Sequence, residues 1–139
     1  MTTESTTKTY RVRNSERCYR FKPEAFINHG PARVGVYELV TFDENQKPVI
    51  LFVGAAFDET IQASLEGHAT GTRAPAAEEL FARHPNLYFD YIERWDAKSK
   101  DDAQDIFWWL VQKHRPPYND LATVRPSGRY AEINVIEED

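Results

Sequence analysis

Two runs of mainly apolar positions, separated by a short polar run, predict a hairpin in the first half of the chain. Residues 34–42 are rich in β-branched and aromatic side chains and predict a strand. Residues 49–54 are apolar throughout, which is typical of a central strand, and a polar turn over residues 43–48 joins the two segments. Residues 87–95 have a similar character and predict a third strand. These three segments form the core of the expected sheet.

Helical spacing appears between and after these strands. Ile61 and Leu65 lie one turn apart and predict a helix over about residues 59–68, with Asp58 as its N-cap. Residues 74–84 predict a second helix, which has a proline in its first turn.

A third helix is predicted between Ser99, its expected N-cap, and Arg115, because Pro116 follows and ends it. Two acidic residues in its first turn suit the helix dipole. The stripe that we expect to face the sheet consists of Ala103, Ile106, Phe107, Leu110 and His114.

The two ends of the chain add weaker signals. Residues 10–26 alternate loosely and predict a strand or hairpin, residues 28–31 a turn, and residues 129–136 a last strand at a sheet edge. The predicted fold class is α+β: a small, mainly antiparallel sheet with three core strands, extra edge strands and helices packed on it.

Composition narrows the class of protein. Hydrophobic residues make up 41% of the 139, enough for one core, and the single Cys18 excludes an internal disulfide. No apolar run reaches the ~18–20 residues of a membrane helix. Residues 1–7 are polar, unlike the apolar stretch of a signal peptide. We therefore expect a cytoplasmic protein without a membrane partner.

The net charge of −5 is unevenly distributed. Residues 1–22 contain six Lys or Arg and two acids, whereas the rest of the chain contains 11 and 20. An acidic body repels phosphate, but a basic arm can bind nucleic acid. The arm can equally lie against its own acidic body. Its candidate binding residues are Arg11, Arg13 and Arg17, with Arg20 and Lys22 beside them.

Three short motifs occur in order on the predicted elements. They are Gly35-Val36-Tyr37 on the first strand, Phe52-Val53-Gly54 on the second, and Pro116-Pro117-Tyr118-Asn119 after the last helix. Together they resemble the GIY-YIG nuclease domain over residues 33–119. The resemblance divides the chain into a basic N-terminal extension (1–32), this domain, and a C-terminal extension with an edge strand (120–139).

The resemblance implies metal-dependent phosphodiester hydrolysis, yet several expected groups are missing. Tyr37 and Asn119 match the family site. Phe52 stands at the second tyrosine and lacks its hydroxyl. Ser64, or Gln62 if no residue is inserted, stands at the arginine that holds the phosphate. Phe107 stands at the glutamate that binds the metal.

Phe107 argues against catalysis, because Mg²⁺ and similar hard cations need carboxylate oxygen. We therefore expect no metal or other cofactor. Under the alternative of a divergent metal-dependent endonuclease, Glu66 is the candidate ligand for Mg²⁺ or Mn²⁺. His68 either approaches this cleft or interacts with its own helix dipole.

The aromatic run at residues 107–109 spans ~200° of helix, so Trp108 and Trp109 cannot both lie on the inward stripe. One of them packs under a terminal segment, or at least one forms an exposed anchor for a partner. The expected function is a pseudoenzyme that acts as a binding module, with a protein partner or homodimer favoured. The alternatives are the divergent nuclease and a nucleic-acid binder that does not cleave.

Overall fold

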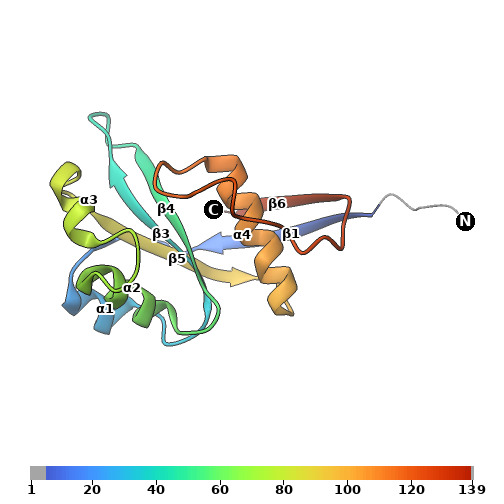
Figure 1. The fold of residues 1–139 in the computed structure, drawn as a ribbon, viewed down its shortest axis with the longest axis horizontal. Coiled ribbons are helices and arrows are strands. Elements are labelled where there is room, and N and C mark those ends of the chain that lie inside the picture. Colours follow the sequence, from blue (N-terminus) through green and yellow to red (C-terminus); the bar gives the residue numbers. More distant parts are fainter. Residues whose placement is uncertain (1–5, 139) are drawn as a thin grey trace, which may run out of the picture.

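In the computed structural model, which describes residues 6–138, one six-stranded sheet is covered by helices (Figure 1). The predicted α+β class and the mainly antiparallel sheet are confirmed. The strands are β1 (Thr7–Asn14), β2 (Tyr19–Arg20), β3 (Gly35–Phe42), β4 (Pro48–Ala56), β5 (Tyr88–Trp95) and β6 (Glu132–Glu138). The helices are α1 (Pro23–His29), α2 (Ile61–Thr70), α3 (Ala77–Arg83) and α4 (Lys100–His114).

The strand order is β4-β3-β5-β1-β6, with β2 paired to β5. All the pairs are antiparallel except β1 with β6. Strand β1 therefore lies inside the sheet although it comes from the basic N-terminal segment, and Figure 1 shows it beside β6. Residues 1–5 of that segment lie outside the described residues. Among residues 6–138, no helix has both the length and the hydropathy needed to cross a bilayer.

The sheet separates two hydrophobic clusters, because successive side chains of a strand point to opposite faces. We call the face that is covered by α1, α2 and α3 the α2 face. Its buried residues include Phe26, Tyr37, Leu39, Leu65 and Phe89. The other face, covered by α4, is the α4 face. Its buried residues include Tyr10, Val36, Val53, Ile92 and Ile106.

The prediction that residues 49–54 form a central strand is wrong, because β4 lies at one edge of the sheet. Its apolar character has another cause: Leu51 contributes to the α2 face and Val53 to the α4 face. The closing turn covers the open edge. Asn119 Oδ1 accepts from Val53 N (2.8 Å), Asn119 Nδ2 donates to Val53 O (2.9 Å), and Tyr118 N donates to Leu51 O (3.0 Å).

The strand or hairpin predicted up to residue 26 and the turn predicted at residues 28–31 are also partly wrong, because α1 forms over Pro23–His29. A proline occupies its first turn, where a missing N–H costs nothing. Only seven residues long, it depends on packing rather than intrinsic propensity, and Ala25 and Phe26 supply that packing.

The predicted helix ends agree with the structure to varying degrees. Ser99 caps α4 as predicted, accepting a hydrogen bond from Asp102 N (3.1 Å). The N-cap of α2 is Thr60, whose hydroxyl accepts from Ala63 N (3.0 Å), and not the predicted Asp58. Helix α3 begins at Ala77, later than the predicted start at residue 74.

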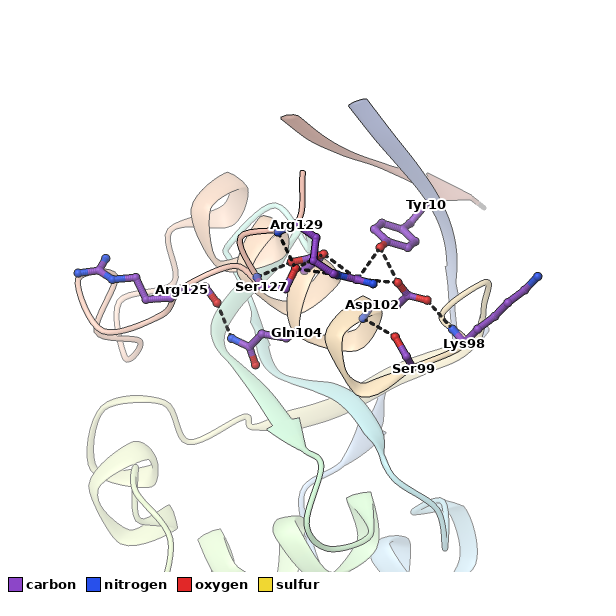
Figure 2. A network of polar contacts seen from close by, with 9 residues as sticks. Tyr10, Lys98, Ser99, Asp102, Gln104, Arg125, Ser127 and Arg129 are labelled. Atoms are coloured by element: carbon purple, nitrogen blue, oxygen red, sulfur yellow. Dashed lines mark hydrogen bonds and ion pairs between the residues drawn. The ribbon is translucent and has the colours of Figure 1, made fainter. Parts of the chain in front are cut away.

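A polar network fastens the C-terminal segment onto α4 (Figure 2). Asp105, fully buried, accepts from Ser127 N (2.6 Å), Ser127 Oγ (2.9 Å) and Arg129 Nη2 (3.2 Å). Arg129 also donates to Asp102 (2.8 Å), which accepts from Tyr10 OH (2.8 Å). Partial burial opposes ionisation of Asp102, but the hydrogen bond from Arg129 lowers its pKa to about 2. The network joins β1, α4 and the segment that precedes β6.

Candidate functional site

Tyr37 of β3 and His68 of α2 form a buried pair, and neither is exposed. The Tyr37 hydroxyl lies 2.6 Å from His68 Nε2, and His68 Nδ1 lies 2.8 Å from Pro75 O. A carbonyl can only accept, so Nδ1 carries the proton and Nε2 accepts from the tyrosine. Burial lowers the pKa of His68 to about 4, which keeps the ring neutral. His68 therefore contacts Tyr37 instead of its own helix terminus.

The residues around this pair are packed side chains. The ring centroid of Phe52 lies 5.3 Å from that of His68 and 6.4 Å from that of Tyr37. Ser64 is fully buried, and its hydroxyl donates to Glu59 (2.8 Å). The three positions Tyr37, Phe52 and Ser64 thus lie together on the α2 face.

Arg73 supplies a cation beside this cluster that sequence reasoning missed. Its guanidinium carbon lies 6.0 Å from the centre of the Tyr37 ring, and Nη2 donates to Ala55 O (2.9 Å). Arg73 comes two residues after Gly71, whose left-handed backbone ends α2. The sequence signal for Arg73 is its position as a cation shortly after the end of α2.

Phe107 is not part of this cluster, because it packs on the α4 face. Its half-buried ring lies 6.3 Å from that of Phe57. Trp108 and Trp109 are also half-buried against the same hydrophobic cluster, and Lys113 Nζ lies 5.1 Å from the centre of the Trp109 ring. Neither tryptophan projects freely into solvent.

The remaining positions are dispersed. Glu66 is exposed on α2, whereas the Gln62 amide donates to Phe26 O (2.7 Å). Asn119 pairs with the edge of β4. Within residues 6–138, no group of three or more His, Cys, Asp and Glu side chains has an arrangement that could hold a metal ion.

The basic residues of the N-terminal segment divide into two sets. Arg11 pairs with Glu138 (3.2 Å) and Arg13 with Glu16 (3.9 Å), so these cations lie against the protein's own acids. The second set borders a groove of about 550 Å³ beside α1. Its polar lining includes Arg17, Arg20, Lys22, Glu24, Asn28 and His29.

Two buried acids on the α4 face form a second candidate site. Glu38 of β3 and Asp90 of β5 are directly opposite in the strand register and are 3% and 8% exposed. Asn14 Nδ2 donates to Glu38 Oε1 (3.2 Å), and the Cys18 thiol lies 3.8 Å from Asp90 Oδ2. Both acids line a cavity of about 590 Å³.

Burial controls the ionisation of this acid pair. It raises the pKa of Asp90 to about 6, and burial together with the neighbouring Asp90 raises the pKa of Glu38 well above its usual value. At neutral pH we therefore expect these two neighbouring, buried carboxyls to hold one proton between them. Burial and the nearby Asp90 also raise the pKa of the Cys18 thiol to about 12, so it stays protonated.

Sequence reasoning missed this pair, although the strand pattern contains a signal. Val36, Glu38 and Val40 alternate along β3, so an acid occupies a position that the period of two assigns to the core. Asp90 does the same in β5, two residues before Ile92. Acidic residues are rarely buried unless they are paired, so acids at inward-facing strand positions indicate a candidate functional site.

The acid pair makes stability depend on pH. An unfolded carboxyl loses its proton near pH 4, whereas the folded pair keeps one above pH 6, so the folded state binds more protons in between. The free energy of unfolding is therefore expected to fall as the pH rises from about 4. Glu38→Gln should flatten this slope and stabilise the protein at pH 8 by roughly 1–3 kcal/mol.

Urea unfolding between pH 4.5 and 8 measures both effects. Glu66→Gln, which removes an exposed acid from α2, is the matched control and should leave the slope unchanged. A Glu38→Gln protein that is less stable than the parent at pH 8, with the parent's pH slope, would contradict the shared proton.

Comparisons of the chain with protein-family models, with curated proteins and with solved structures gave no match.

Proposed function

We propose that this chain is a GIY-YIG-like domain without nuclease chemistry, and that it acts by binding a protein partner or a second copy of itself. The main support for this proposal is that the Tyr37 hydroxyl is inaccessible to solvent. The hydroxyl is hydrogen-bonded to His68, and Tyr37 has no exposed surface. A tyrosine that activates water must reach that water, so this arrangement favours a structural role for Tyr37.

The residues at and near the expected metal-binding position support the same proposal. Phe107 offers aromatic carbon at the position of the family's metal ligand, and it packs against Phe57 on the other face of the sheet. The Asp105 carboxylate on the same helix is already occupied by Ser127 and Arg129. A bound metal supplies several kcal/mol of transition-state stabilisation, and each ~1.4 kcal/mol changes the rate tenfold. Without a metal ligand at Phe107, we therefore expect most of the hydrolytic activity to be lost.

A cleavage assay tests this proposal. Plasmid, branched DNA and RNA are incubated with the protein and Mg²⁺ or Mn²⁺, and we expect no cleavage above the protein-free reaction. Tyr37→Phe keeps the ring that packs against Phe52 and removes only the hydroxyl, so it is the matched control. Metal-dependent cleavage that Tyr37→Phe abolishes would refute the proposal and support the divergent nuclease.

Light scattering after size-exclusion chromatography separates the two kinds of binding target. A molar mass that rises from one chain to two with protein concentration identifies a second copy as the target. A constant mass of 16.1 kDa excludes a second copy and leaves a different protein as the proposed target.

A nucleic-acid binder that does not cleave is the second candidate, because the groove beside α1 gathers Arg17, Arg20 and Lys22. His29 stacks on Tyr19 at its wall, with ring centroids 4.1 Å apart. Aromatic stacking beside cations is how proteins hold single strands. Against it, Lys22 pairs with Glu24 (3.5 Å) and the body of the chain is acidic.

Gel retardation at ~50 mM salt separates this candidate from protein binding. Under the first proposal we expect no retardation of single- or double-stranded probes. Retardation that is lost in Arg17→Ala/Arg20→Ala, weakens steeply with salt, and persists in Arg11→Ala/Arg13→Ala would establish the groove as a nucleic-acid site instead.

A further inference from the structure

We propose that the cavity at Glu38 and Asp90 is a binding site for a small organic cation, an amine or guanidinium compound with a short aliphatic body. This site lies on the α4 face, apart from the Tyr37 cluster, and does not depend on the function proposed above. The cavity of about 590 Å³ is within the size range of small-molecule sites.

The two acids have more acceptor capacity than the protein fills. An ionised carboxylate offers about four acceptor positions, but Glu38 receives one hydrogen bond from Asn14, and Asp90 one weak bond from Cys18. Asp90 Oδ1 is buried and receives no hydrogen bond from an N–H, hydroxyl or thiol group in the described part of the chain, so the proton that it shares with Glu38 is the one donor beside it. A buried acceptor without a donor is costly, and a ligand N–H removes that cost.

The chemistry of the lining selects an organic cation over the other ligand classes. An anion would meet two buried carboxyls. A metal ion would find too few ligands, because residues 6–138 contain no suitable group of three. An ammonium supplies three donors and a guanidinium five, which suits a site rich in acceptors.

The remaining walls fit the body of such a ligand. Apolar side chains of Val40, Val49 and Ile50 line the cavity, and the C-terminal end of α4 contributes His114 and Arg115. Val49 is 38% exposed, so this side of the cavity reaches the surface. An aliphatic body would lie along these strands, with its charged nitrogen between the two acids.

Binding of a cation should displace the shared proton. The titratable and charged groups around the pair are Cys18, His114, Arg115 and Glu137. Cys18 is a neutral thiol, His114 is hydrogen-bonded to Glu137 (3.0 Å), and Arg115 is an exposed cation. A bound ammonium takes over the role of the proton at the acid pair. Calorimetry in two buffers with different ionisation enthalpies therefore measures a proton released for each ligand bound.

The test is titration calorimetry of the full chain at pH 7 with n-butylamine and agmatine, and with 1-butanol as the uncharged comparison. We expect both cations to bind with proton release and the alcohol not to bind. Glu38→Gln should weaken binding at least ~10-fold, a change of about 1.4 kcal/mol. Glu44→Gln, which removes an exposed acid in the β3–β4 turn, should not change the affinity.

A second variant keeps the test decisive if Glu38→Gln folds poorly. Val49→Trp places a large ring at the exposed side of the cavity, leaves both acids in place, and should also abolish binding. The proposal is overturned if neither cation binds at ~10 mM, if 1-butanol binds equally well, or if folded Glu38→Gln and Val49→Trp proteins bind like the parent.

Discussion

Gly54→Ala is expected to lower the free energy of unfolding by about 3 kcal/mol or more. An added Cβ at Gly54 would overlap the ring of Tyr37, which lies directly across the β3–β4 pair. The ring cannot move aside, because its hydroxyl is fixed by His68 on the helix above. Urea unfolding monitored by circular dichroism measures the loss.

A double-mutant cycle identifies the cause. Tyr37→Ala alone should cost about 3–5 kcal/mol, since it removes a fully buried aromatic ring. The double variant Tyr37→Ala/Gly54→Ala should be nearly as stable as Tyr37→Ala, because the ring that the new methyl group would meet is gone. Strict additivity of the two losses would mean that Gly54 is required for another reason.

Asp105→Ala is expected to lower the free energy of unfolding by a comparable amount, about 3–5 kcal/mol. It leaves Ser127 N–H without its 2.6 Å acceptor and removes one of the two acids that hold Arg129. The segment before β6 then loses its attachment to α4. We expect a lower urea midpoint and faster amide hydrogen exchange over residues 127–131.

Two further variants show whether the loss of stability in Asp105→Ala comes from the polar network around Asp105. Asp101→Ala removes an exposed acid from the preceding turn of the same helix and should cost far less than Asp105→Ala. Asp105→Asn keeps an oxygen for Ser127 N–H and should fall between them. Equal losses for Asp101→Ala and Asp105→Ala would show that the buried carboxylate contributes no more than a surface charge.

Local signals predicted much of the fold. The ends of α4 follow from the Ser99 cap and from Pro116, both of which act within a few residues. The pairing of β3 with β4 follows from one turn between two apolar runs. The position of β4 at the edge, the burial of β1 between β5 and β6, and the parallel β1–β6 pair depend on contacts between distant segments. The spacing of apolar residues within a segment does not indicate which distant segment it will pair with.

The candidate sites illustrate the same limit. The sequence motifs drew attention to Tyr37, but its partner His68 lies 31 residues away, and only the fold brings them into contact. Phe107 was grouped with Tyr37 by motif spacing, yet the sheet lies between their clusters. Glu38 and Asp90 were missed because acids in strands are usually read as solvent-facing, although their alternation with Val36 and Ile92 placed them inward.

The closing turn after α4 also determines where a partner could add a β-strand to this sheet. Along the outer side of β4, Leu51 O is bonded by Tyr118 N, Val53 by the Asn119 side chain, and Ala55 O by Arg73. An incoming strand would find these groups already occupied. Among the strands of residues 6–138, β6 is the other edge, so strand addition by a partner is directed to the opposite end of the sheet.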